Sequence, residues 1–303
     1  MRISMTSVFV TLLAGTVVSA EPPPIIEPKF DGWERVAAGK GYDLYKYYPD
    51  AATGELGQVI RDLGSNAVGR QNNHFALVVD YRDGHVDQVI ASAIGSGFST
   101  WSMRKMWDHA QAIPGREARV LVSGTYFNYT NIEFSIDEVI GMVAVPTFGL
   151  KVNGVTLHRG LSAEINKHPN RKENLRMISF QKGSAEIIKW DDAAFDDPSK
   201  LNLVPAIDVS YETDGGTAGR HIFGLVDDHI AVHLLTIEMK QETAVNCLAA
   251  HFGVSKSRMV QLDGGASVRV VADEKVRLPI AGLNNAALNR PWRDLPHMFM
   301  FSD

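Results

Sequence analysis

Runs of apolar residues divide the chain into short strand-like segments. The stretch HFALVVDYRDGHVDQVIAS, residues 74–92, has apolar runs on both sides of Arg82-Asp83-Gly84, which predicts two strands paired as a hairpin. A second hairpin is predicted in residues 220–239, RHIFGLVDDHIAVHLLTIEM, with its turn at Asp227-Asp228. The apolar run ARVLV, residues 118–122, predicts a buried strand.

Two stretches have helical rather than alternating periodicity. In the first, Ser99–Ser102 can cap a helix that ends at Pro114-Gly115. Its apolar positions are Met103, Met106, Trp107 and Ala110. The second predicted helix ends at Gly253, where a C-terminal glycine is typical. Its apolar positions are Val245, Leu248, Ala249 and Phe252.

The two halves of the chain share one order of predicted elements: hairpin, helix, apolar strand and glycine-bearing turn. The turns are SGTYF, residues 123–127, and DGGAS, residues 263–267. If the two preceding strands lie in one sheet, both turns emerge at the same edge, where a site is expected. We expect a single mixed α/β (α+β) domain. It should have a β-rich core of mostly hairpin-connected strands and at least two packed helices.

The first twenty residues have the features of an export signal. Residues 1–20 begin with a basic residue, continue with an apolar run of about 11 residues and end in Val-Ser-Ala. A membrane-spanning helix needs roughly 20 residues, so we favour a cleaved signal over an uncleaved tether. Residues 21–40 form a proline-rich leader and residues 41–303 the domain. The protein is expected in the periplasm or secreted, without stable membrane insertion after signal cleavage.

Charge and cysteine content limit the possible partners and the stabilising chemistry. The chain has 30 basic and 35 acidic residues, and loss of Arg2 with the signal gives 29 and 35, a net charge of −6. This mild acidity, without a Lys/Arg cluster, argues against a nucleic-acid partner. Cys247 is the only cysteine, so an internal disulfide is excluded. Its apolar helical setting favours a buried thiol over a nucleophile.

The segment MVQLDGGASVRVV, residues 259–271, breaks an apolar strand with Asp263, Gly264 and Gly265. Asp and Gly are poor strand formers. One explanation is a tight turn with the glycines at positive φ. The other is a ligand site, in which bare backbone N–H groups bind phosphate oxygens or a sugar beside the Asp263 carboxylate. Ser267 would add a hydroxyl. The spacing alone leaves both open.

These residues carry a resemblance to a known family. QLDGG followed by GASVRVV, the upstream HFGV and the earlier GRHIFGLV resemble the carboxy-terminal half of the phosphodiester glycosidase domain family. This family includes the enzyme that uncovers mannose 6-phosphate by removing N-acetylglucosamine. The segment VSGTYF is similar to the family's Asn-Gly-Gly-Phe-Phe segment. The similarity runs from about residue 74 to the C-terminus and identifies a divergent, bacterial-type member.

The resemblance implies a hydrolase that cleaves a sugar 1-phosphodiester to free sugar and a phosphomonoester. Asp263 and Arg220 would be catalytic: Arg220 as a phosphate clamp and Asp263 as the carboxylate that contacts water or a sugar hydroxyl. For Arg220 the plainer alternative is a surface salt bridge. The implied substrate-binding residues are Ser123, Gly124, Tyr126, Phe127, Asn128, Gly264, Gly265 and Ser267. Tyr126 and Phe127 could equally belong to the core.

Two departures from the family pattern bear on activity. Ser123 stands where the family usually has Asn, and Ala266 replaces the third glycine. Because of Ser123, the alternative of a non-catalytic secreted module that binds a glycan or phosphate stays open.

No cofactor and no catalytic metal are expected. His229 and His233 lie an even number of residues apart and could share one strand face, which leaves a metal-dependent phosphodiesterase as a further alternative. The acidic residues of WDDAAFDDPSK, residues 190–200, fit a solvated loop better than a calcium loop.

Overall fold

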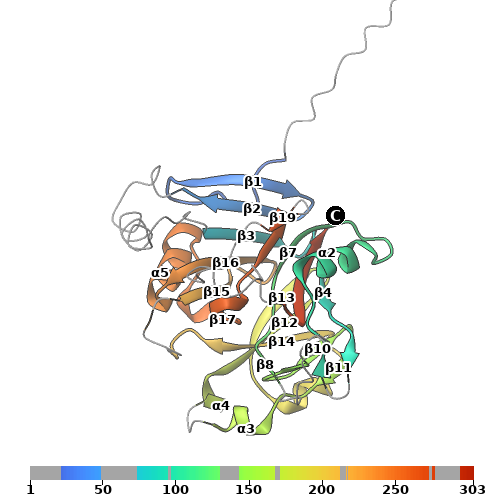
Figure 1. The fold of residues 1–303 in the computed structure, drawn as a ribbon. Coiled ribbons are helices and arrows are strands. Elements are labelled where there is room, and N and C mark those ends of the chain that lie inside the picture. The colour runs from blue at the N-terminus through green and yellow to red at the C-terminus, as the bar shows by residue number, and fades with distance from the viewer. Residues whose placement is uncertain are drawn as a thin grey trace, which may run out of the picture.

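The computed structural model describes residues 22–48, 74–94, 97–129, 143–167, 171–211, 216, 218–272, 275–276 and 294–303. The predicted signal, residues 1–20, lies outside the described residues. Within them the chain forms a β-rich α+β domain of antiparallel sheets with four α-helices, as predicted (Figure 1). None of the described helices is long and apolar enough to cross a membrane.

The largest sheet has eleven strands in the order β1-β2-β3-β16-β15-β17-β14-β10-β11, with β12 pairing β14 and β13 pairing β12. Its strands are β1 Trp33–Gly39, β2 Tyr42–Tyr47, β3 His74–Asp80, β10 Leu150–Val152, β11 Val155–His158, β12 Leu175–Gln181, β13 Ser184–Lys189, β14 Asn202–Asp208, β15 Ala218–Leu225, β16 Ile230–Met239 and β17 Met259–Gln261.

Two smaller sheets complete the body. The five-stranded sheet has the order β19-β18-β7-β20-β4 and the four-stranded sheet the order β5-β6-β9-β8. The strands of the first are β4 His85–Ile90, β7 Ala118–Ser123, β18 Val270–Ala272, β19 Lys275–Val276 and β20 His297–Ser302. The strands of the second are β5 Ala93–Ile94, β6 Gly97–Phe98, β8 Phe127–Tyr129 and β9 Ala144–Pro146.

The eleven- and five-stranded sheets pack face to face around the main hydrophobic core. Phe223 and Val260 of the large sheet and Val122 and Phe299 of the smaller sheet belong to this one buried cluster. Helix α5, Gln241–Phe252, covers the outer face of the large sheet, and helix α2, Met103–Gln111, covers the outer face of the smaller one (Figure 1). The core is therefore made by two sheets, each with one helix on its far side.

Both long helices confirm the periodicity and end signals in the sequence. Ser102 caps α2 by accepting a hydrogen bond from the Lys105 N–H (3.3 Å), and all four predicted apolar positions are buried. Helix α5 ends at Gly253, which has φ 72° in the left-handed region. Two short helices, α3 Ser162–Ile165 and α4 Arg171–Asn174, follow β11.

Of the two predicted hairpins, one is confirmed and one is wrong. Strands β15 and β16 pair antiparallel, as predicted. Strands β3 and β4 both exist, but β3 pairs with β2 and β16 in the large sheet while β4 pairs with β20 in the smaller sheet. Because both edges of β3 are occupied, the turn after Asp80 carries the chain from one sheet to the other.

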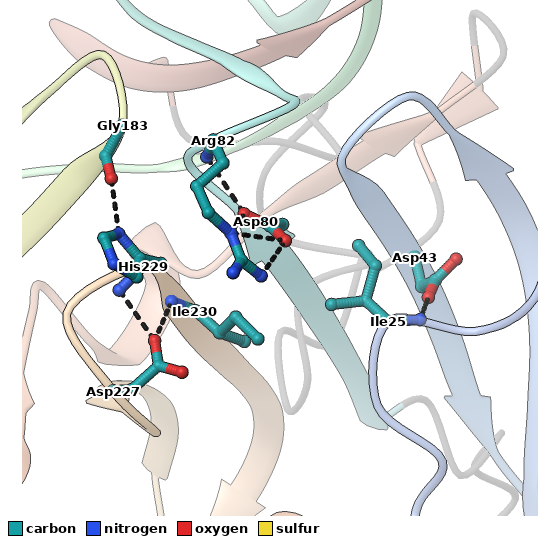
Figure 2. A network of polar contacts seen from close by, with 8 residues as sticks. All are labelled: Ile25, Asp43, Asp80, Arg82, Gly183, Asp227, His229 and Ile230. Carbon is teal, nitrogen blue, oxygen red and sulfur yellow. Dashed lines mark hydrogen bonds and ion pairs between the residues drawn. The ribbon is translucent and has the colours of Figure 1, made fainter.

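Side-chain carboxylates hold these turns and the leader in place. The Asp80 carboxylate accepts bonds from the Arg82 guanidinium and backbone, and Asp227 accepts from the backbone N–H groups of His229 and Ile230 (Figure 2). The buried Asp43 accepts the backbone N–H of Ile25 at 2.6 Å (Figure 2). The leader thus lies against β2, with Ile25 packed on the α5 side of the large sheet.

Candidate functional site

The Asp-Gly-Gly segment is the turn that leads from the large sheet to the smaller one. After β17 the backbone N–H of Leu262 still donates to the His221 carbonyl (2.9 Å), and the chain then turns through a single 3₁₀ segment, Gly265–Ser267. Gly265 has φ 58°, which favours glycine. Gly264 is required for a different reason, since a Cβ there would lie 2.7 Å from the Gly219 carbonyl oxygen. Asp263 and Gly264 are half-buried and Gly265 is exposed.

Arg220 lies across the sheet from Asp263. The β15–β17 ladder pairs Ile222 with Gln261, and the Leu262–His221 hydrogen bond extends this register by one residue. Continuing it once more places Arg220 opposite Asp263 on the same face. Arg220 is 2% exposed as a whole residue, and its side chain donates from Nε to the Met239 carbonyl (3.0 Å) and from Nη2 to the Gly216 carbonyl (2.8 Å). In this extended register a buried arginine therefore lies opposite a half-buried aspartate.

Tyr126 lies within reach of this pair. Its hydroxyl accepts a hydrogen bond from Gln261 Nε2 at 3.1 Å. Burial is the main cause that raises the Tyr126 pKa, and the Asp263 charge raises it further, while the Gln261 bond and the charges of Arg220 and Arg171 lower it. The phenol is therefore protonated at neutral pH, and the charges of Asp263, Arg220 and Arg171 all act on it.

The loop that carries Tyr126 begins at a buried serine. Ser123 Oγ accepts the backbone N–H of Arg269 (3.3 Å) and lies 3.5 Å from His221 Nδ1. Ser123 and Gly124 are both buried, and a Cβ on Gly124 would lie 1.8 Å from His297 Nδ1. The expectation that the strands before the two turns share a sheet is wrong. Strand β7 belongs to the five-stranded sheet and β17 to the eleven-stranded sheet, and the two sheets pack around one core.

The remaining predicted site residues divide between surface and interior. Asn128 is half-buried on β8, where it pairs with Val145. Phe127 belongs to the core cluster beneath α2, and Ser267 is fully buried. The accessible part of the predicted site consists of Asp263, Gly264, Gly265, Tyr126 and Asn128.

Sequence reasoning missed a buried polar chain behind the loop. His297 Nδ1 accepts the Thr125 N–H (3.0 Å), so its Nε2 carries the proton and donates to Gln88 Oε1 (3.0 Å). Gln88 in turn donates to Asn202 Oδ1 (2.9 Å). Burial lowers the His297 pKa to about 3, so the imidazole is neutral. The sequence signal for this buried polar chain was the presence of polar Gln88 and His297 within strands that also carry apolar residues.

A second buried pair lies under Ser123. His221 Nε2 is 2.9 Å from His233 Nδ1, between Phe223 and Phe299. Burial lowers the His221 pKa to about 3 and the His233 pKa well below its ordinary value. Both imidazoles are therefore neutral.

The residues of the metal alternative have other contacts. His229 precedes β16 and its Nδ1 is 2.6 Å from the Gly183 carbonyl (Figure 2), whereas His233 contacts His221 in the interior. In the acidic loop, Asp191 caps a 3₁₀ turn, and Arg159 pairs with Asp192 and Asp196. The described part of the chain contains no group of three or more His, Cys, Asp or Glu residues placed to hold a metal.

The fold and this turn define an α+β protein of stacked antiparallel sheets with a carboxylate and bare backbone at the sheet end. Solved structures with a similar fold include the catalytic domain of zebrafish N-acetylglucosamine-1-phosphodiester alpha-N-acetylglucosaminidase, auto-inhibited by its pro-peptide. It is 9% identical, with 91% of this chain and 88% of that chain covered and a TM-score of 0.53. At this identity the likeness establishes a distant fold relationship.

A second solved structure with a similar fold comes from Burkholderia pseudomallei and is assigned as an exported protein. It is also 9% identical, with 92% of this chain and 97% of that chain covered and a TM-score of 0.51. No protein-family model and no curated protein matches the sequence.

Proposed function

We propose that the protein is an exported hydrolase that cleaves a sugar 1-phosphodiester, or a phosphorylated glycan of that linkage, to free sugar and a phosphomonoester. The observation that carries the proposal is the opposition of Arg220 and Asp263 beside the bare backbone of Gly264 and Gly265. The fold shared with a phosphodiester glycosidase catalytic domain supports it.

The chemistry of this linkage suits a site with few ionisable groups. The phosphomonoester is a good leaving group from the sugar, so its departure does not need the strong general acid that ordinary glycosidases supply. The site must hold the phosphate charge, stabilise an oxocarbenium-like sugar and direct a water molecule. Asp263 is half-buried, so its carboxylate can contact both solvent water and a sugar hydroxyl. It is our candidate for directing the water.

Arg220 supplies positive charge opposite Asp263 in the extended β15–β17 register. Two of its N–H donors already bind the carbonyls of Met239 and Gly216, which fixes the plane of the guanidinium. A preorganised cation stabilises developing negative charge without moving during the reaction. In the proposal its charge acts on the phosphate.

The turn and loop would bind the rest of the substrate. In the proposal the Gly264 and Gly265 amides receive phosphate oxygens, and Tyr126 and Asn128 contact the sugar. Ser123, Gly124, Phe127 and Ser267 are buried, so in the proposal they act indirectly by shaping the turn and loop.

Export is proposed from the leader sequence, residues 1–20, and is supported by the exported assignment of the Burkholderia protein. The compartment would be the periplasm or the extracellular space. The substrate would then belong to envelope or extracellular glycopolymers.

A p-nitrophenyl diester of a sugar 1-phosphate separates the three functions. Glycosidic cleavage releases free sugar and colourless p-nitrophenyl phosphate, whereas cleavage of the aryl ester releases coloured p-nitrophenolate directly. Release of free sugar that resists a chelator supports the proposal. Chelator-sensitive release of p-nitrophenolate would support the metal-dependent phosphodiesterase. Binding without either product would support the binding module.

The matched variants are Asp263→Asn and Asp228→Asn. Asp228 lies at the far end of β15, is 77% exposed and pairs with Arg258. We expect Asp263→Asn to reduce sugar release at least 100-fold and Asp228→Asn to leave it unchanged. Equal activity in the two variants would exclude Asp263 as a catalytic group.

A further inference from the structure

Arg171 is a cation near Tyr126 that the sequence did not single out. It is the first residue of α4 and its side chain is 18% exposed, compared with 2% exposure for the whole Arg220 residue. Its Nη1 donates to the carbonyl (3.2 Å) and to the carboxylate (3.3 Å) of Glu164 on α3. Glu164 therefore holds the guanidinium from one side.

Aromatic rings connect Arg171 with the candidate site. Its guanidinium carbon lies 5.7 Å from the centre of the Phe148 ring, and the Phe148 ring meets the Tyr126 ring edge to face at 5.5 Å. Tyr126 is bonded to Gln261 next to the Asp-Gly-Gly turn. The Arg171 charge also acts on the Tyr126 hydroxyl, in the same direction as the Arg220 charge and against the Asp263 charge.

One donor of Arg171 has no partner within the described part of the chain. Its Nε is buried and makes no hydrogen bond there. A buried N–H without a partner costs about 1–3 kcal/mol and calls for an explanation such as a bound ion. Nε and Nη2 form the edge of a guanidinium that binds a phosphate or carboxylate through two parallel bonds, and Glu164 occupies Nη1. The bonds to Glu164 therefore use Nη1, and Nε stays without a partner in the described part of the chain.

We propose that Arg171 is the residue that binds the phosphate group of the substrate. Arg220, opposite Asp263 in the extended register, is then the fixed charge of the site. This assignment rests on the proposed function for its substrate. It divides the two cations by role. Arg171 is partly exposed and is held by the carbonyl and the carboxylate of one residue, Glu164, whereas the carbonyls of Met239 and Gly216 hold the buried Arg220. The specificity for a charged diester over a neutral glycoside would lie with Arg171.

Inorganic phosphate is the direct probe, titrated into the full chain by calorimetry at constant ionic strength. We expect Arg171→Gln to weaken phosphate binding at least tenfold and Arg171→Lys to weaken it less, because a lysine keeps the charge but loses the two-bond edge. Arg116→Gln is the matched control, since Arg116 is 32% exposed and pairs with Asp87 away from this site. It should bind phosphate as the unmodified protein does.

Glu164→Gln distinguishes anion binding from a purely structural ion pair. If the pair only stabilises α3 and α4, Arg171→Gln and Glu164→Gln should lower the melting temperature alike and leave phosphate affinity unchanged. If Arg171 binds phosphate, Glu164→Gln should raise the affinity because a competing carboxylate is removed. Unchanged affinity in Arg171→Gln, or no phosphate binding by the unmodified protein, would overturn the assignment.

The hydrolysis assay on the same proteins keeps the two proposals apart. Phosphate binding that depends on Arg171 but comes without sugar release would support this assignment and contradict the hydrolase. Sugar release with an unchanged KM in Arg171→Gln would support the hydrolase and contradict this assignment.

Discussion

Arg220 lies opposite Asp263 where the β15–β17 register is extended past the end of the ladder, yet Arg220 is almost fully buried while Asp263 is half-buried. The two residues should therefore contribute unequally to stability. The arginine binds two main-chain carbonyls from below the surface. The aspartate is on the side where a substrate would approach.

We expect Arg220→Leu to lower the free energy of unfolding by about 2–4 kcal/mol, because it leaves the carbonyls of Met239 and Gly216 without their donor. Asp263→Asn should cost less than about 1 kcal/mol. Urea unfolding measures both. Arg258→Leu is the control, since Arg258 is 37% exposed and pairs with a surface aspartate, Asp228. If Arg220→Leu costs no more than this control, the buried guanidinium is not structural.

The parts of the fold that local chemistry determines could be predicted from the sequence. Helices α2 and α5 follow from apolar spacing, the Ser102 cap and Gly253. The glycine turn at Asp263 could also be identified, because its glycines meet strict backbone requirements. These features depend on neighbours within a few residues, which the sequence lists directly.

Long-range pairing could not be predicted in the same way. Strand β3 pairs with β16, which lies more than 150 positions later in the chain, and not with β4. The turn sequence between β3 and β4 does not show that a distant strand pairs with β3 instead. The contact of His297 with Thr125 spans 172 positions. Arg171 comes near Tyr126 only through Phe148, on a separate part of the chain. These contacts arise from sheet stacking, which local periodicity does not encode.

The buried histidines predict an acid-sensitive fold. Burial lowers the pKa of His221 and His297 to about 3 and that of His74 to about 4, below the ordinary value of 6.5. As the pH falls below about 6.5, these histidines become protonated in the unfolded chain but stay neutral in the native protein. The free energy of unfolding therefore decreases until the pH reaches the native pKa values. Each group should contribute a slope of about 1.4 kcal/mol per pH unit.

Urea midpoints between pH 7 and pH 4.5 measure this slope. His74→Leu removes one titrating group and should flatten the slope by about one proton's contribution. His109→Gln, on the exposed face of α2, is the surface control. A stability that is flat from pH 7 to pH 4.5 would contradict the neutral, buried state of these imidazoles.

The Cys247 thiol should not react with thiol reagents in the native protein. It is buried in α5, and burial raises the pKa of its thiol to about 12, so the reactive thiolate is scarce. We expect Ellman's reagent at pH 8 to detect no thiol in the folded chain and one equivalent in guanidinium chloride. Rapid modification under native conditions would show that α5 opens or that the thiol is accessible.

Gly124 has no space for a side chain because the His297 imidazole packs against it. A Cβ on Gly124 would lie 1.8 Å from His297 Nδ1, the atom that accepts the Thr125 N–H. Gly124→Ala must displace the imidazole and break its bonds to Thr125 and Gln88. We expect a loss of about 2–4 kcal/mol in unfolding free energy, measured by urea denaturation. Sugar release should also fall, because this loop positions Tyr126.

A double-mutant cycle shows whether the imidazole is the cause. His297→Ala alone should destabilise by leaving Thr125 and Gln88 without their partner. Once the ring is absent, however, the alanine at position 124 has space, so the double variant should be more stable than the sum of the single changes predicts. Gly216→Ala is the control, since a Cβ there meets open space. Strict additivity in the cycle would mean that Gly124 is constrained by something other than His297.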